Sequence, residues 1–200
     1  MKFPFFASFI VFCVWLSYEI RKQRKLQNKS MDAFWEKEKR ANNTRRKSLD
    51  GLAYIQIPFD TLPMDVLADD PQVKEYHELL QELAKEPIVN LSGISNTDLK
   101  LEYGAPNLKV LSAYDQRYTL LARTLQSLAQ ILYDNGLLLE SCQVLEFAVS
   151  THTDISASYR LLITIYKELH KEHKISELLP IAQSLNSGLK NAIIHMIEEA

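Results

Sequence analysis

The chain has 200 residues, of which 46% are hydrophobic, and a net charge of −2 at pH 7. This length and composition suit one modest globular domain with an appendage, and they exclude a low-complexity or collagen-like chain. Two cysteines, Cys13 and Cys142, are too few for a disulfide framework or a thiolate metal site, and they fit a reducing compartment.

The small net charge hides an uneven distribution along the chain. Residues 21–47 hold eleven Lys or Arg against three Asp or Glu, whereas residues 48–200 hold eleven against twenty-one. A nucleic-acid-binding domain has its basic patch on the folded module itself. We therefore predict no nucleic-acid partner.

Residues 3–20 form an apolar run with no charge before Glu19, and a strongly basic segment follows directly. A helix over this run reaches about 27 Å, which is close to the thickness of a thin bilayer. Trp15 and Tyr18 lie toward its basic end, where amphipathic rings favour the membrane interface. We predict a single-pass transmembrane signal anchor over residues 1–20.

Two other interpretations of this run are weaker. A cleaved secretory signal would have Lys2 alone as its positive region, and no small-residue cleavage site follows the run. A buried core helix does not suit the terminal position or the charged flank. Because the basic residues follow the span, the C-terminal part should be cytoplasmic at the cell membrane, and three N-glycosylation sequons at Asn28, Asn42 and Asn90 would lie on the wrong side.

Residues 21–69 are predicted to be a basic juxtamembrane segment followed by an extended linker. The segment is compatible with a helix up to Arg40. Its charges either contact anionic lipid headgroups, at about 1 kcal/mol for each Lys or Arg, or only set the topology. The predicted membrane-surface residues are Arg21, Lys22, Arg24 and Lys25.

The linker contains an alternating apolar stretch, residues 52–63, that is interrupted by Pro58 and Pro63. An isolated extended stretch with no partner strand is not expected to form a sheet. We predict an ordered arm across the helical body, and a docking peptide for a partner is the alternative.

Residues 70–200 are predicted to be an α-helical domain. Asp70 and Pro71 indicate a capped helix that stops before Pro87, and a short helix should end at Gly104. Large apolar residues then recur every three or four positions from residue 108 to residue 132, which indicates a long helix with one buried face, ending at Asn135-Gly136.

Large and small residues alternate in a definite order around this turn. The large residues are Leu125, Leu128 and Leu132 in the first helix and Leu145 in the second. The small residues are Ala129 in the first helix and Ser141 and Ala148 in the second. This order resembles the tetratricopeptide repeat, a helix–turn–helix unit of about 34 residues. The resemblance implies that small residues let the two helices approach.

A second unit follows one period later. Tyr159, Leu162 and Tyr166 stand 34 residues after the three large residues of the first helix. The register then slips by about three residues, a second helix should begin near Ile175, and residues 191–199 should form a cap. We predict an all-α fold, with a transmembrane helix followed by a tetratricopeptide-like solenoid fragment. A plain helical bundle with similar spacing is the alternative.

Catalytic chemistry is not indicated. No phosphate-binding, dinucleotide-binding or metalloprotease motif occurs, and His170 and His173 offer two metal ligands without a third. Cys142 should be a structural thiol, and His152 with Asp154 should be capping groups in a turn. We predict no enzyme activity, no cofactor and no metal.

The resemblance implies a concave binding face on the first helix of each unit. The predicted protein-binding residues are Arg123, Gln126, Gln130, Arg160, Thr164 and Lys167. We predict a membrane-anchored scaffold for protein–protein interaction or assembly, with a partner still to be identified. The alternatives are a merely solvated face, or a structural or regulatory subunit of a membrane complex that acts through its transmembrane helix.

Overall fold

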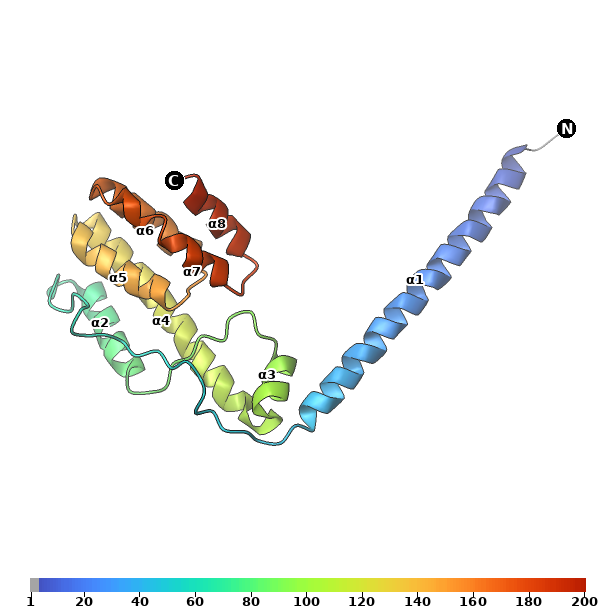
Figure 1. The fold of residues 1–200 in the computed structure, drawn as a ribbon, viewed down its shortest axis with the longest axis horizontal. Helices are drawn as coiled ribbons and strands as arrows, with labels where there is room; N and C mark the ends of the chain where they lie inside the picture. Colours follow the sequence, from blue (N-terminus) through green and yellow to red (C-terminus); the bar gives the residue numbers. More distant parts are fainter. Residues whose placement is uncertain (1–3) are drawn as a thin grey trace. The chain divides into compact units, whose positions relative to one another are not determined.

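The computed structural model describes residues 4–200, and for residues 4–7 and Leu26 it describes the backbone alone. This part of the chain is built from helices (Figure 1), which confirms the predicted all-α class. It divides into two compact units, Met1–Lys47 with Asn96–Pro106 and Ser48–Ser95 with Asn107–Ala200. We call these unit 1 and unit 2. The division cuts across the predicted segments 1–20, 21–69 and 70–200.

Unit 1 is dominated by the helix α1 (Pro4–Asn42), which has 39 residues and is therefore about 58 Å long. Its sequence favours one continuous helix because it has no glycine, and its proline stands at the first helical position. The predicted anchor and the helical part of the basic segment thus belong to the same helix, without a break at residue 20.

The short helix α3 (Asn96–Tyr103) packs against α1 near its C-terminal end. The Lys100 ammonium bonds to the Glu38 carboxylate and donates a 2.7 Å hydrogen bond to Asn42 Oδ1. Thr97 donates to the second oxygen of Glu38 at 2.6 Å. Hydrogen bonds from Lys100 and Thr97 lower the pKa of Glu38 below its ordinary value. The charged network fixes α3 to one side of α1.

Gly104 ends α3, as predicted, with a φ of +94°. A Cβ at this position would lie 2.2 Å from the carbonyl oxygen of Arg45. Glycine is required here both by the left-handed conformation and by the close approach of the two backbone segments.

The predicted transmembrane span covers residues 3–20. Phe3 lies outside the described residues, and so do the side chains of residues 4–7. In the part of the chain that the structure does describe, no helix is both long enough and apolar enough to cross a membrane. The predicted span does not meet this criterion within the described residues, and it remains a prediction.

Unit 2 begins with the predicted arm. Tyr54 forms an isolated antiparallel bridge with Val89, and Ile55 N–H donates to the Ile88 carbonyl at 2.9 Å. Ile57 and Leu62 are buried in the core. The arm is thus ordered by core contacts and by one bridge.

The helix α2 (Pro71–Leu83) begins as predicted. The Asp70 carboxylate accepts hydrogen bonds from the backbone N–H groups of Gln72 and Val73, at 2.8 and 3.1 Å. Such a cap satisfies backbone donors that have no partner within the helix. The buried face of α2 contains a histidine, His77, between apolar neighbours.

The central helices are α4 (Leu108–Asp134) and α5 (Leu138–Ser150). Gly136 turns the chain between them with a φ of +77°. Leu125, Leu132 and Leu145 are fully buried, as their spacing predicts. Ser141 Oγ donates a 2.7 Å hydrogen bond to the Ala129 carbonyl, so the two small residues do meet at the α4–α5 contact.

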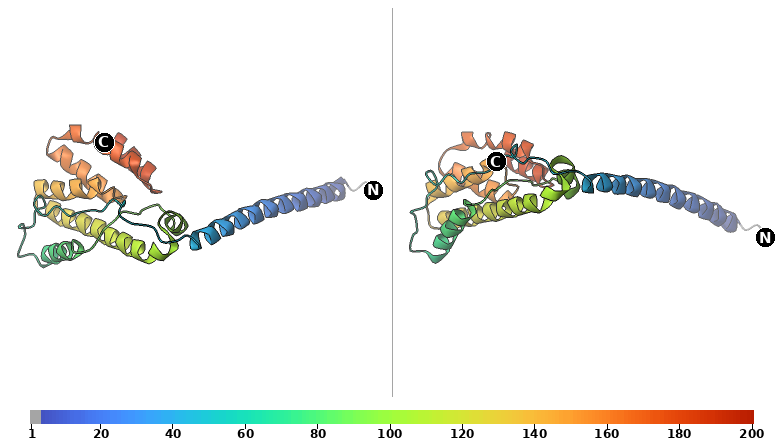
Figure 2. Two further views of the ribbon diagram at one scale, coloured as in Figure 1. Left: turned by 60° about the horizontal axis from the view of Figure 1, so that its bottom comes forward. Right: turned by 90° about the horizontal axis from the view of Figure 1, so that it is seen from below.

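The chain ends with α6 (Ser156–Glu168), the 3₁₀ helix η2 (Glu172–Lys174), α7 (Leu178–Ser184) and α8 (Lys190–Glu198). The helix predicted near Ile175 begins three residues later, and Pro180 stands in its first turn, where a missing N–H costs nothing. As Figure 2 shows, α8 lies against the end of the helical stack, where it contacts α6 and α7.

Candidate functional site

Two side-chain hydrogen bonds tie α4 to α6. Ser158 Oγ donates to Gln126 Oε1 at 2.6 Å, and the Tyr133 hydroxyl donates to Glu168 Oε1 at 2.6 Å. The paired residues are 32 and 35 positions apart, which brackets the predicted 34-residue period. Parallel side-by-side helices occur in many helical folds, so this packing alone identifies no family.

The predicted binding residues lie on these two helices. On α4 they follow the spacing i, i+3, i+7, and on α6 the spacing i, i+4, i+7, so each set shares one helix face. We define the α4–α6 face by the six residues Arg123, Gln126, Gln130, Arg160, Thr164 and Lys167.

The polar members of this face already have partners within the chain. Gln126 accepts the bond from Ser158, and Gln130 Nε2 donates to Asp134 Oδ1 at 2.9 Å. Thr164 Oγ1 donates to the backbone carbonyl of Arg160 at 3.0 Å. These three groups therefore shape the face more than they offer free hydrogen bonds to a ligand.

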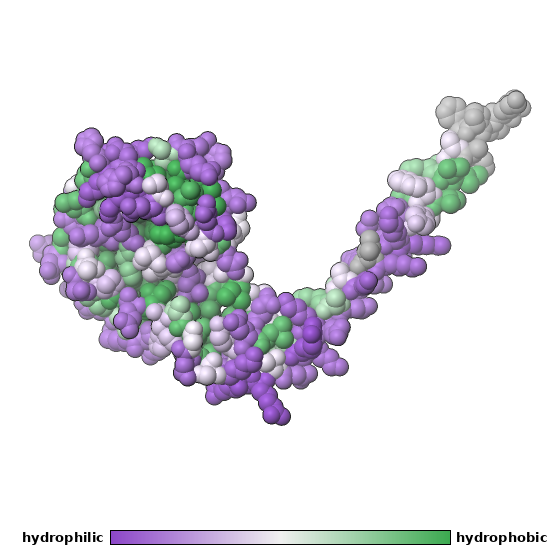
Figure 3. All heavy atoms as spheres, in the orientation of Figure 1, coloured by the Kyte–Doolittle hydropathy of each residue, from purple (hydrophilic) through white to green (hydrophobic). Residues whose placement is uncertain are grey.

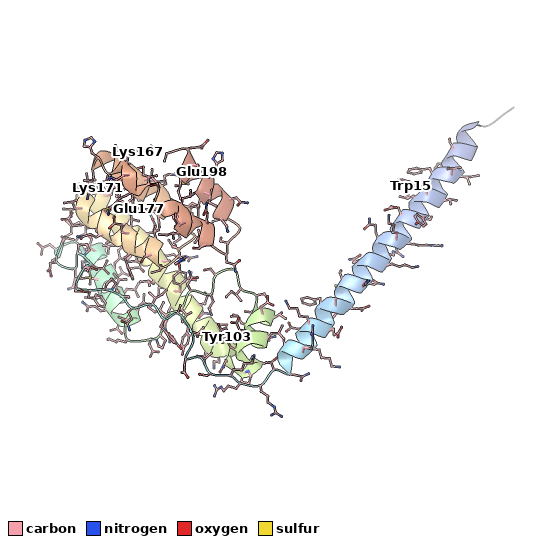
Figure 4. All side chains as sticks on the ribbon, viewed as in Figure 1. Trp15, Tyr103, Lys167, Lys171, Glu177 and Glu198 are labelled. Atoms are coloured by element: carbon pink, nitrogen blue, oxygen red, sulfur yellow. The ribbon has the colours of Figure 1, made fainter. Side chains whose placement is uncertain are left out.

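The cationic members differ from the polar ones. Arg123, Arg160 and Lys167 are exposed, and no ion pair within residues 4–200 neutralises them. Figure 4 labels Lys167 on α6. Exposed guanidinium groups retain their full set of donors for an anionic ligand.

Buried tyrosines hold the helices of this face in place. The Tyr118 hydroxyl donates to the Thr151 carbonyl at 3.2 Å, and the Tyr159 hydroxyl donates to the Thr153 carbonyl at 3.0 Å. Burial raises the pKa of both hydroxyls above its ordinary value, so they stay protonated donors. They fix the turn between α5 and α6.

A charged cluster lies on the other side of α6. Glu146 Oε1 accepts hydrogen bonds from the Tyr166 hydroxyl at 2.9 Å and from Lys174 Nζ at 2.7 Å. Burial alone would raise the pKa of Glu146, but the bonds from Lys174 and Tyr166 outweigh it and lower this pKa. These groups, together with α7, line a hollow of about 210 Å³. The cluster has a clear structural role, because it joins α5, α6 and η2.

Cys142 lies beside this cluster and is buried. Burial, with a contribution from the nearby Glu146 carboxylate, raises the pKa of the thiol to about 11. A thiol with this pKa is protonated at neutral pH and is a poor nucleophile. The predicted structural thiol is consistent with this environment.

A polar hollow of about 200 Å³ lies near the α5–α6 turn. Ser187 Oγ donates to Asp154 Oδ2 at 2.6 Å, and His152 Nδ1 lies 3.1 Å from the Ser150 carbonyl. His152, whose φ is +61°, forms no hydrogen bond with Asp154 or Ser187 in the described structure. His152, Asp154 and Ser187 are thus not joined as a nucleophile–base–acid triad in the described structure.

The predicted membrane-surface residues all stand on α1. Arg21, Lys22, Arg24 and Lys25 are exposed, and Lys22 Nζ lies 3.7 Å from the Glu19 carboxylate. The hollow that they border with Tyr18 runs along the side of a single helix. Contact between these residues and lipid headgroups remains a prediction.

No metal centre occurs among the described residues, where no three His, Cys, Asp or Glu side chains could hold an ion together. His170 and His173 are both exposed.

No local sequence pattern indicates the residues that organise the α4–α6 face. Ser158 gives no local signal, because its partner Gln126 lies 32 residues earlier. Asn90 stands in a sequon, which gives no sign of a structural role, yet its amide bonds to the α5–α6 turn. Pairs of this kind follow from tertiary packing and not from any periodic pattern.

Comparison with known proteins finds no matching family model, no matching curated protein and no matching solved structure. The resemblance to the tetratricopeptide repeat therefore remains a prediction that rests on the spacing of large and small residues in this chain.

Proposed function

We propose that this protein is a membrane-anchored scaffold for protein–protein interaction, in which a tetratricopeptide-like helical unit presents the α4–α6 face to a partner. The observation that favours this function is the pair of exposed arginines, Arg123 and Arg160, on adjacent helices of an acidic unit. Unit 2 holds ten Lys or Arg against nineteen Asp or Glu, so its net charge is −9. An unneutralised basic face on such a unit is complementary in charge to an acidic ligand, which supports a binding role.

The anchor is supported by the apolar part of α1. Nine large apolar side chains between Phe9 and Ile20 are 40% to 68% exposed. Figure 3 shows this hydrophobic stretch near the N-terminal end of the helix, next to the hydrophilic basic segment. Contiguous apolar surface in water is unfavourable, at about 25 cal/mol per Å², and a bilayer would cover it. The proposed span also takes in residues 3–7, whose side chains lie outside the described part.

A cytoplasmic position for unit 2 is supported by two observations. The basic residues follow the proposed span, as the positive-inside rule requires. In addition, Asn90 Nδ2, the atom to which an N-linked glycan would attach, already donates to the carbonyl oxygens of Thr151 and His152. A glycan there would disturb these bonds, so the fold suits a compartment without N-glycosylation.

Photo-crosslinking of the full-length chain in its membrane tests the binding face. Replacing Arg123 and Arg160 by glutamine should reduce partner capture without changing the thermal unfolding temperature. The substitutions K74Q and K109Q remove exposed charge outside the face and serve as the matched control. Equal capture by both variants would remove the α4–α6 face from the proposal.

Labelling with a membrane-impermeant maleimide tests the topology. A cysteine introduced by A200C should react in permeabilised cells and stay unlabelled in intact cells. Cys142 is buried and should not interfere, and the exposed Cys13 is removed by C13S in every variant. Labelling in intact cells would place unit 2 outside and contradict the proposed orientation.

A further inference from the structure

We infer that the α4–α6 face binds an acidic peptide segment of its protein partner, with the carboxylates of that segment seated on Arg123 and Arg160. The inference rests on the proposed function, because it names the chemistry of the ligand for the same face.

The arginines of unit 2 separate into two groups. Arg117 is neutralised, since its Nη2 lies 3.2 Å from Glu86 Oε2 and its Nη1 donates to the Pro87 carbonyl. The other two arginines, Arg123 and Arg160, have no carboxylate partner in the described structure, and both lie on the α4–α6 face. A guanidinium fork matches a carboxylate in two parallel hydrogen bonds, which makes arginine suited to acidic ligands.

The charge on the α4–α6 face is distributed unevenly along the two helices. The far end of the face has two carboxylates, Asp134 on α4 and Glu168 on α6, and these accept bonds from Gln130 and Tyr133. Asp134 stands eleven residues after Arg123, or about 16 Å along the helix. Lys167, next to Glu168, also stands at this far end, so one cation faces two carboxylates there. A bound acidic residue is therefore favoured at the Arg123 and Arg160 end. This polarity would orient the peptide.

The size of the face suits a short peptide. The six residues lie within eight positions on each helix, which is two helical turns or about 10 Å from the first to the last. An extended peptide advances about 3.3 Å per residue, so roughly three or four residues span the face.

The charge of unit 2 as a whole favours a short peptide over a lipid surface or a nucleic acid. An extended polyanion, such as an anionic lipid surface or a nucleic acid, is repelled by the net charge of −9 on this unit. A short acidic segment interacts mainly with nearby charges, because the Debye length at physiological salt is about 8 Å. Local cations therefore decide its binding.

Fluorescence anisotropy with the full chain in phosphatidylcholine nanodiscs tests the inference. The probes are a labelled hexaglutamate peptide and a hexaglutamine peptide of equal length. The basic segment after the span also attracts acidic peptides, so every protein in the comparison has the same substitutions R21Q, K22Q, R24Q and K25Q. Seven Lys or Arg remain between residues 26 and 47, and their contribution is the same in every variant. Hexaglutamate should bind at least about tenfold more tightly than hexaglutamine, and its affinity should fall as salt rises.

Two variants assign the binding to the arginines. R123Q with R160Q should weaken hexaglutamate binding about tenfold, whereas K74Q with K109Q, which remove the same charge elsewhere, should leave it unchanged. R123K with R160K keeps the positive charge but lacks the guanidinium fork. Its affinity for hexaglutamate should lie between the affinities of the arginine variant and the control variant. Equal binding of the two peptides, or equal loss in the arginine and control variants, would overturn the inference.

A lipid ligand gives a different result. Suppose that R123Q with R160Q reduced binding to phosphatidylserine nanodiscs, while hexaglutamate and hexaglutamine bound equally well. The ligand would then be a lipid headgroup, and the inference would be wrong. Failure of the acidic peptide is also distinguishable from failure of the proposed function. Crosslinking that still depends on the α4–α6 face would keep the function and reject only the acidic partner.

Discussion

The side-chain amide of Asn90 donates a 2.9 Å hydrogen bond to the carbonyl oxygen of Thr151 and a second one, of 3.1 Å, to that of His152. Its own oxygen accepts a 2.9 Å hydrogen bond from Ser92 N–H. One side chain thus caps the C-terminal end of α5 and holds the loop before α3. The position of α6, and so of Arg160, depends on this turn.

Substitution N90A should lower the free energy of unfolding of unit 2 by about 2 kcal/mol, because it removes three hydrogen bonds and leaves the Thr151 carbonyl with the Tyr118 hydroxyl as its remaining side-chain partner. Denaturant unfolding of the full chain in detergent measures the change. Substitution N191A, at an exposed asparagine on α8, is the control and should be nearly neutral. Equal effects of the two substitutions would contradict the capping role.

Glu146 should make the protein less stable in acid. Its pKa is lowered in the folded state, so the stability that it contributes is present above the unfolded value near 4.5 and is lost as pH falls through the folded value. Substitution E146Q should cost about 1 kcal/mol at pH 7, a modest figure because the side chain is 37% exposed. Unfolding at pH 7 and at pH 4 measures both quantities. A cost that is the same at both pH values would show that the charge of Glu146 is unimportant.

His77 should make the stability sensitive to pH in a higher range. Its Nε2 is buried without a hydrogen-bond partner, and burial lowers its pKa, against a smaller opposing effect of Asp65. Since the unfolded chain takes up the proton first, stability should fall as pH drops below about 6.5.

Substitution H77L should therefore stabilise the protein, by about 1 kcal/mol, and more at pH 5.5 than at pH 7.5. Thermal unfolding at the two pH values measures the difference. Substitution H173L, at an exposed histidine, should show no such dependence on pH. A constant H77L effect across this range would reject the titration of His77 as its cause.

Gly104 should be indispensable for the contact between α3 and α1. Substitution G104A places a methyl group against the Arg45 carbonyl and imposes a positive φ on alanine, at a cost of about 2 kcal/mol. Faster hydrogen exchange of the amides of α3 measures the loss. Gly51 has no neighbour within 4 Å of a built Cβ, so G51A is the control. Unchanged exchange in G104A would show that the close approach is not needed.

Sequence patterns predicted the helices well where one local signal dominates. Asp70 marks the start of α2, and Gly104 and Gly136 mark the ends of α3 and α4, as expected from capping and left-handed turns. The sequence predicts the start of α7 three residues too early, because no side-chain cap marks it and a 3₁₀ helix and a turn precede it.

The sequence by itself determined which residues enter the core. The spacing of Leu125, Leu132 and Leu145 is a property of helix geometry, because residues three or four positions apart share one face. All three are buried as a result. The charge pattern, with a basic segment and an acidic body, is likewise visible in the chain alone.

Only the tertiary structure decided which polar groups are paired and which are left exposed. Gln126 was predicted as a binding residue, yet Ser158 already bonds to it, whereas Arg123 and Arg160 have no carboxylate partner in the described structure. Likewise, α3 belongs to unit 1 although residues of unit 2 precede and follow it. Such pairs lie tens of residues apart, and no local periodicity records them, because they arise when packed helices bring distant side chains within hydrogen-bonding distance.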